Sequence, residues 1–173
     1  TFTVSHSDNN GCDILFRLIG GTGKVEKYIQ SLGIKDISIS TTEEEMHKDW
    51  DTQFTNWSTP YAMGLLLMKF FKGEILSKNS QEYLWEKMVN TTTGANRIIA
   101  LLPEGTIVAH KTGSSSTNDD GVTAATNDAG IVKLSDGNYF AIVVFVSDSK
   151  SNVKAREGII AQISKAVWDY YNE

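Results

Sequence analysis

Residues 107–146 read IVAHKTGSSSTNDDGVTAATNDAGIVKLSDGNYFAIVVFV, and this stretch decides the fold class. It contains three runs rich in apolar and β-branched residues, at 107–114, 122–133 and 138–146, which predict three strands. The turn Leu-Ser-Asp-Gly at 134–137 is short enough to join the second and third runs as a hairpin. We therefore predict an antiparallel meander.

Helical periodicity lies on both sides of this meander. Apolar residues recur at i, i+3, i+4 and i+7 over residues 12–19 and 25–32, and two more helices are predicted after Pro60 and around residues 84–89. A last amphipathic helix has a predicted apolar face at Ile160, Ile163, Val167 and Tyr170. Helices followed by an antiparallel sheet and a closing helix indicate the α+β class.

The segment 40–59 shows no periodicity at all. A stretch of this length in a compact domain is usually a functional loop or an Ω-loop packed on its own side chains. We predict a helical subdomain over residues 1–90 that includes this Ω-loop, and an α/β subdomain over residues 91–173.

Composition excludes several classes of protein. The 173 residues carry 16 Lys+Arg against 21 Asp+Glu, a net charge of −5 that argues against a nucleic-acid partner. The longest apolar run, 139–146, is too short for a membrane span. The single cysteine, Cys12, cannot form an intrachain disulfide, and the three histidines lack the spacing of metal ligands, so no metal is predicted.

Two short polar motifs carry the functional information. Ser-Asp-Asn at residues 7–9 has the residue types that cap any helix, and Lys-Thr-Gly-Ser at residues 111–114 alone fits an edge or a bulge of a strand. Together they are far more specific. A Ser-Asp-Asn that opens a helix, followed by a Lys-Thr-Gly on a strand, is the paired signature of class A β-lactamases and penicillin-binding proteins.

From Ser7 nearly to its end, the chain resembles a class A serine β-lactamase. The acidic loop, Pro60, Arg97 and the final helix follow the family's order, and DNNGCD, MHKDW and ATND are most similar to Bacteroides-type cephalosporinases and their extended-spectrum relatives. The resemblance implies the β-lactamase/transpeptidase-like fold, antibiotic resistance through hydrolysis of β-lactams, no cofactor, and a periplasmic or secreted location.

The resemblance also implies roles for single residues of the first motif. Ser7 would relay a proton to the departing lactam nitrogen. Asn9 would hydrogen-bond the side-chain amide of the substrate, whereas Asp8 would hold the turn.

On the strand, Lys111 with Thr112 and Gly113 would cradle the substrate carboxylate, and the N–H of Ser114 would be one of two oxyanion donors. Arg97 is either the second cation for this carboxylate or a solvated arginine on a short helix; the sequence leaves both open.

The family's deacylating carboxylate lies in the loop, at Glu43, Glu44 or Glu45. A structural alternative exists, because Thr41 with Glu44 and Thr42 with Glu45 both fit a helix capping box. Counting along the family pattern from either side of the loop gives Glu43, which we predict as the base.

Two departures from the family pattern concern this loop. His47 stands where the family usually has an asparagine that helps to hold the water, and Thr41 and Asn56 stand where a charged pair would close the loop. Both put the usual loop conformation in question, and we hypothesise that they suit bulkier cephalosporins.

The nucleophile motif, Ser-x-x-Lys, has no counterpart before Ser7. Ser147 and Ser151 match its spacing but follow Lys-Thr-Gly, the wrong order for the fold, and we interpret them as loop and cap residues. We expect the nucleophile outside these residues, the chain alone to be inactive, and an N-terminal portion to complement it. The alternatives are a penicillin-binding transpeptidase and a non-catalytic β-lactam-binding module.

Overall fold

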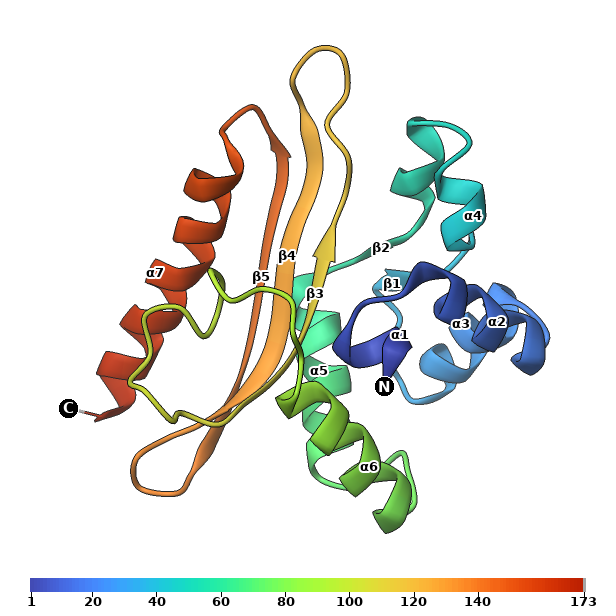
Figure 1. Cartoon of the computed structure of the whole chain (residues 1–173). Coiled ribbons are helices and arrows are strands. Elements are labelled where there is room, and N and C mark those ends of the chain that lie inside the picture. The colour runs from blue at the N-terminus through green and yellow to red at the C-terminus, as the bar shows by residue number, and fades with distance from the viewer. Residues whose placement is uncertain (173) are drawn as a thin grey trace.

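The molecule has helices in its first half and a three-stranded sheet in its second, as Figure 1 shows. The computed structural model describes residues 1–172. In chain order the elements are α1 (Phe2–Ser5), α2 (Asn9–Ile19), α3 (Thr22–Ser31), β1 (Ile37–Ser38), α4 (Glu43–Met46), the 3-10 helix η1 (Asp51–Thr55), β2 (Trp57–Ser58), α5 (Pro60–Phe71), α6 (Lys78–Val89), β3 (Val108–Ser114), β4 (Thr123–Lys133), β5 (Tyr139–Ser149) and α7 (Val153–Asn172).

The predicted meander is confirmed. Strands β3, β4 and β5 pair antiparallel in that order, with Lys111 opposite Ala129 and Thr112 opposite Asp128. The hairpin between β4 and β5 is closed where the N–H of Leu134 donates to the carbonyl of Asn138 at 2.8 Å. The last strand is longer than predicted, because its pairing with β4 continues to Ser149.

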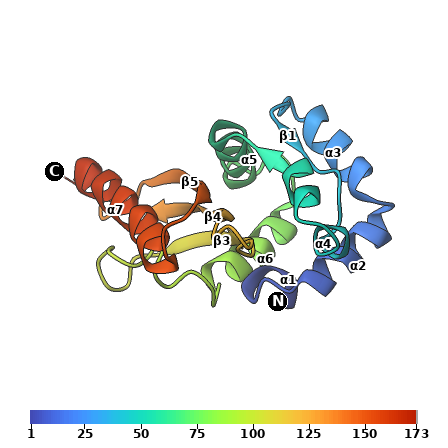
Figure 2. The ribbon, with the colours of Figure 1, turned by 90° about the horizontal axis from the view of Figure 1, so that it is seen from above.

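Each face of the sheet packs against different helices (Figure 2). Because side chains alternate along a strand, Val108 and Val132 face α7 and share a core with Ile160 and Trp168. On the opposite face, Ala109, Ala129 and Ile131 pack against residues of α5 and α6, which are Leu67, Phe70 and Met88. The sheet is therefore covered on both faces, which confirms the α+β architecture.

The C-terminal helix turns a different face inward from the one predicted. Ile160 is fully buried, but Ile163 is 41 % and Tyr170 is 74 % exposed. The buried stripe continues instead through Ser164 and Trp168, at four-residue spacing. Ser164 is small enough to be buried at this contact, and a pattern of apolar residues does not register it.

Helix α2 forms as predicted, but its apolar face is only partly covered. The Asp8 side chain accepts from the N–H of Gly11, and Gly20 ends the helix at φ 99°. Within the described residues α2 packs against α1, α3 and α4, and Leu15 and Ile19 remain about half exposed, at 48 % and 53 %. The periodicity thus predicted the helix correctly and its burial incorrectly.

Candidate active site

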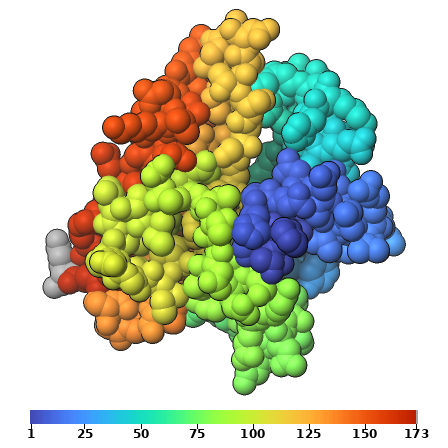
Figure 3. All heavy atoms as spheres, viewed as in Figure 1, coloured from blue at the N-terminus to red at the C-terminus, as the bar shows by residue number. Residues whose placement is uncertain are grey.

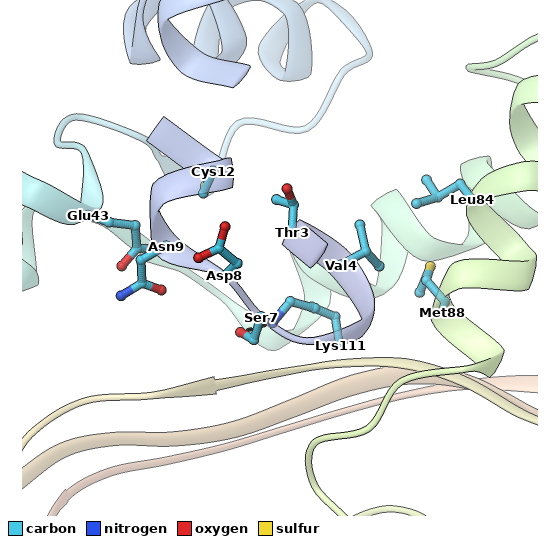
Figure 4. Close-up of a pocket in the computed structure, with 10 residues that line it drawn as sticks. All are labelled: Thr3, Val4, Ser7, Asp8, Asn9, Cys12, Glu43, Leu84, Met88 and Lys111. Carbon is cyan, nitrogen blue, oxygen red and sulfur yellow. Dashed lines mark hydrogen bonds between the residues drawn. The ribbon is translucent and has the colours of Figure 1, made fainter. Parts of the chain in front are cut away.

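A cavity of about 300 Å³ opens where α1, α2, α4 and α6 meet β3. In Figure 3 the surface is hollowed between the segment around α4 (cyan) and the strands (yellow). Four of the eight predicted site residues line the cavity: Ser7, Asn9, Glu43 and Lys111 (Figure 4). The rest of the lining comes from Thr3, Val4, Asp8, Cys12, Leu84 and Met88.

Ser7 and Lys111 are in direct contact. The Lys111 ammonium donates to the Ser7 hydroxyl at 2.5 Å and to the carbonyl of Thr112 at 2.7 Å. Ser7 lies in the turn between α1 and α2 with φ at 54°, a left-handed conformation that a non-glycine residue adopts only at a cost. The turn thereby presents the hydroxyl to the ammonium and the cavity.

Burial lowers the pKa of Lys111 below that of an ordinary lysine. The negative charges of Asp128 and Glu43 act in the opposite direction and favour the protonated form. A partly buried ammonium beside a hydroxyl can hold or move a proton there, and it offers a positive charge to an anionic ligand.

Glu43 begins α4, where three acidic residues follow Thr42. The capping box of Thr42 with Glu45 is confirmed: the Glu45 carboxylate accepts from the N–H of Thr42 at 2.8 Å, and the N–H of Glu45 donates to the Thr42 hydroxyl. The alternative box, of Thr41 with Glu44, does not form, since the N–H of Glu44 bonds elsewhere. Glu45 is thus used as a cap, and Glu43 lines the cavity.

Asp13, which the sequence analysis missed, fastens α4 to α2. Its buried carboxylate accepts from the N–H of Glu43 at 2.8 Å and from the N–H of Glu44 at 2.9 Å. Burial, and then the charge of Asp13, raise the pKa of the Glu43 carboxyl. A carboxylate with a raised pKa is a stronger base near neutral pH.

Neutral hydrogen bonds close the loop that lacks the charged pair. The Asn56 side chain accepts from the N–H groups of Ser40 and Thr41, at 2.7 and 3.0 Å, and donates to the Thr41 carbonyl at 2.9 Å. His47 directly follows α4, with its Nδ1 2.7 Å from the Glu43 carbonyl. The loop is therefore held at both ends by side-chain contacts to its backbone.

Arg97 is neither solvated nor on a helix, so that interpretation was wrong. It lies in a turn before β3, is 6 % exposed, and its Nε donates to Glu157 of α7 at 3.1 Å. Its Nη1 donates to the carbonyls of Gly113 and Asn127, and its Nη2 donates to the Ser114 hydroxyl at 2.7 Å. Burial requires this full set of partners. The signal missed in the sequence was Glu157, a carboxylate near the buried face of α7.

The remaining predicted residues of β3 lie beside the cavity rather than in its lining. Thr112 is 9 % exposed, with its hydroxyl 2.7 Å from that of Thr93, whereas Ser114 is exposed at the end of the strand. Gly113 stands between them and pairs with Asn127.

Cys12 lines the cavity beside the predicted base, but its thiol is a poor nucleophile. Burial, with the charges of Glu43 and Asp13, raises the thiol pKa. Ser147 lies in β5 rather than in a loop, and Ser151 stands two residues before α7, whose first turn is capped by Asn152 instead. Among residues 1–172, no three His, Cys, Asp or Glu side chains gather as a metal site, and no helix is long and apolar enough to span a membrane.

The model of the Beta-lactamase enzyme family matches residues 1–171. The chain belongs to this family. It is 51 % identical over 172 residues to β-lactamase VEB-1 of Pseudomonas aeruginosa, and 44 % identical over 169 residues to a β-lactamase of Bacteroides uniformis. These matches cover 98 % and 97 % of the chain, and 57 % of each relative, so the chain spans little more than half of their length.

Solved structures of the family give the same assignment. The crystal structure of the TLA-3 extended-spectrum β-lactamase superposes with a TM-score of 0.99 at 61 % identity, over 99 % of this chain and 62 % of that one. A class A β-lactamase from Bacteroides cellulosilyticus superposes with a TM-score of 0.95 at 42 % identity, over 99 % and 61 %. The predicted resemblance to class A enzymes, including extended-spectrum ones, is confirmed.

Proposed function

We propose that this chain supplies most of the active site of a β-lactam hydrolase that works through a serine acyl-enzyme. The convergence of Ser7, Asn9, Glu43 and Lys111 on one cavity, from segments far apart in sequence, carries the proposal. The attacking serine would come from a Ser-x-x-Lys segment that joins this chain in the complete enzyme. Cys12, with its raised thiol pKa, does not replace that serine.

Each side chain has a step that its surroundings support. With Lys111 at 2.5 Å, the Ser7 hydroxyl would pass a proton to the lactam nitrogen as the ring opens. Glu43, as a carboxylate, would then take a proton from the water that attacks the acyl-enzyme, and this water would release the product.

Substrate recognition would use the rest of β3. Lys111 and Arg97 would attract the substrate carboxylate, Thr112 and Gly113 would shape its cradle, and the N–H of Ser114 would face the oxyanion. Asn9 would bind the side-chain amide of the substrate. We propose cephalosporins as the preferred class and the bacterial periplasm as the location.

A chromogenic cephalosporin tests this function against its rivals. Incubated with the complete enzyme, it should turn over continuously, and intact mass spectrometry should show little adduct at steady state. A single stoichiometric acylation would indicate a penicillin-binding transpeptidase instead. Absence of both adduct and turnover would indicate a non-catalytic module.

A further inference from the structure

A histidine–aspartate pair lies buried on the α7 face of the sheet, outside the cavity. The Nδ1 of His110 is 3.0 Å from both carboxylate oxygens of Asp128. His110 is 3 % exposed and Asp128 is 0 % exposed. A carboxylate withdrawn fully from water is costly unless its partners compensate for it.

A second partner of Asp128, the N–H of Ile98, links it to the turn that carries Arg97. The N–H of Ile98 donates to Asp128 Oδ2 at 3.3 Å, and the Arg97 guanidinium donates to the carbonyl of the neighbouring Asn127 at 2.8 Å. Asp128 therefore holds the backbone one residue beyond Arg97 against the strand that Arg97 contacts.

The same turn lies closely against the strand that carries Lys111. The Thr91 hydroxyl donates to the carbonyl of His110 at 2.8 Å. At Gly94, with φ at 77°, a Cβ would lie 2.4 Å from Thr112 Cγ2 and 3.4 Å from His110 Cε1. Only glycine fits this approach, so the turn and the buried pair form one packed unit on the α7 face of the sheet.

The charged groups near this unit have opposite effects on the pKa of Lys111. Lys111 and Arg97 are two cations near the same end of β3, and the charge of Arg97 lowers the pKa of Lys111, as burial also does. Among the groups that raise this pKa, Asp128 has the largest effect. The buried carboxylate thus acts on Lys111 through the sheet, whereas Glu157 neutralises Arg97 by direct contact.

We propose that Asp128, oriented by His110, is a positioning residue for both cations: it anchors the turn that carries Arg97, and it holds a negative charge behind Lys111. The inference rests on the proposed function only where it assigns these cations to a substrate carboxylate. His110 and Asp128 do not line the cavity, so they would act on the site only through Lys111 and Arg97.

Titration of Lys111 tests directly whether the charge of Asp128 acts on it. In the complete enzyme labelled with ¹³C-lysine, the Lys111 signal is assigned through Lys111→Arg, and its titration is compared with that of Asp128→Asn. The asparagine keeps the shape and removes the charge, so the Lys111 midpoint should move to lower pH. Thr126→Val is the matched control, because Thr126 is a buried, uncharged residue two positions away that accepts from Arg156. In Thr126→Val, the midpoint of the Lys111 titration should equal that of the wild type.

Turnover tests the positioning. Asp128→Asn should raise the KM for a carboxylate-bearing cephalosporin about twofold to thirtyfold and leave the deacylation rate constant unchanged. His110→Phe keeps the charge but not its orientation, so KM should rise while the Lys111 midpoint does not fall. If Asp128→Asn fails to fold, the KM of His110→Phe alone tests the proposal.

An unchanged Lys111 midpoint in folded Asp128→Asn, or an unchanged KM in His110→Phe, would overturn the proposal. A shifted midpoint in an enzyme that turns over no β-lactam would support the charge effect and count against the proposed function.

Discussion

The Nζ atom of Lys111 lies 2.5 Å from the Oγ atom of Ser7, so a strand residue and a turn residue 104 positions apart share a hydrogen bond. The turn between α1 and α2 meets strand β3 at this contact, and the cavity opens beside it. The positive φ of Ser7 directs its hydroxyl toward the ammonium. The two motifs of the sequence are thus one site in space.

Glu43→Gln should separate the two chemical steps of the complete enzyme. The glutamine keeps the shape of the side chain and removes the proton acceptor, so acylation should proceed and deacylation should nearly stop. A stopped-flow burst followed by near-arrest, with a covalent adduct in the intact mass, is the expected result. Glu44→Gln is the control: Glu44 is exposed and pairs with Lys48, so steady turnover should stay close to wild type. An adduct trapped by Glu44→Gln and not by Glu43→Gln would show that the base was assigned wrongly.

The pH dependence of deacylation should reflect the environment of Glu43. Because burial and Asp13 raise its pKa, the acid limb of the deacylation profile should lie above the ordinary glutamate range. Asp13→Asn removes the charge and should move this limb to lower pH, whereas Glu44→Gln should leave it in place. An acid limb unaffected by Asp13→Asn would show that Asp13 acts on Glu43 only through its hydrogen bonds.

The same raised pKa has a consequence for folding. Between the unfolded and folded pKa values of Glu43, the folded protein binds more protons than the unfolded chain, so this group's contribution to stability falls as pH rises through that window. In Glu43→Gln this contribution is absent. Urea unfolding of both proteins across the window should show a smaller loss of stability with rising pH in the variant; parallel curves would contradict it.

Arg97→Ala should cost both stability and recognition. It leaves Glu157 without its cation and with only the Asn96 amide as a donor, and removing one member of a buried ion pair costs about 3–5 kcal/mol. Loss of a charge-assisted contact with substrate is worth about 1.5–3 kcal/mol, so kcat/KM should fall roughly tenfold to a hundredfold. Arg97→Ala with Glu157→Gln should regain part of the stability but none of the kcat/KM. Full recovery of kcat/KM in the double variant would assign Arg97 a structural role only.

The 173-residue chain alone should hydrolyse no β-lactam, because no serine of a Ser-x-x-Lys motif accompanies Ser7 and Glu43 in its cavity. Mixing it with an N-terminal portion that carries the motif should restore turnover of a chromogenic cephalosporin. Steady turnover by the chain alone would show that a serine such as Ser147 or Ser151 acts as nucleophile.

Much of the local structure could be predicted from the sequence. Periodicity predicted the longer helices and the three strands, but not the short helices α1 and α4. Asp8 and Thr42 were each one of two candidate caps, because a capping bond joins residues only three positions apart. The two motifs, in their order, predicted the family. Ser7 and Lys111 could be assigned to one site only through the resemblance.

The tertiary structure alone decided which side chains are buried and what they contact. Asp13 reaches Glu43 across 30 residues, and Arg97 reaches Glu157 across 60. These contacts depend on how α2, α4 and α7 pack against their neighbours, and no local pattern encodes that packing. The sequence does not show whether a charged side chain is exposed to water or buried. The free energy of burying it, and therefore its pKa and its role, depends on the partners that the fold places beside it.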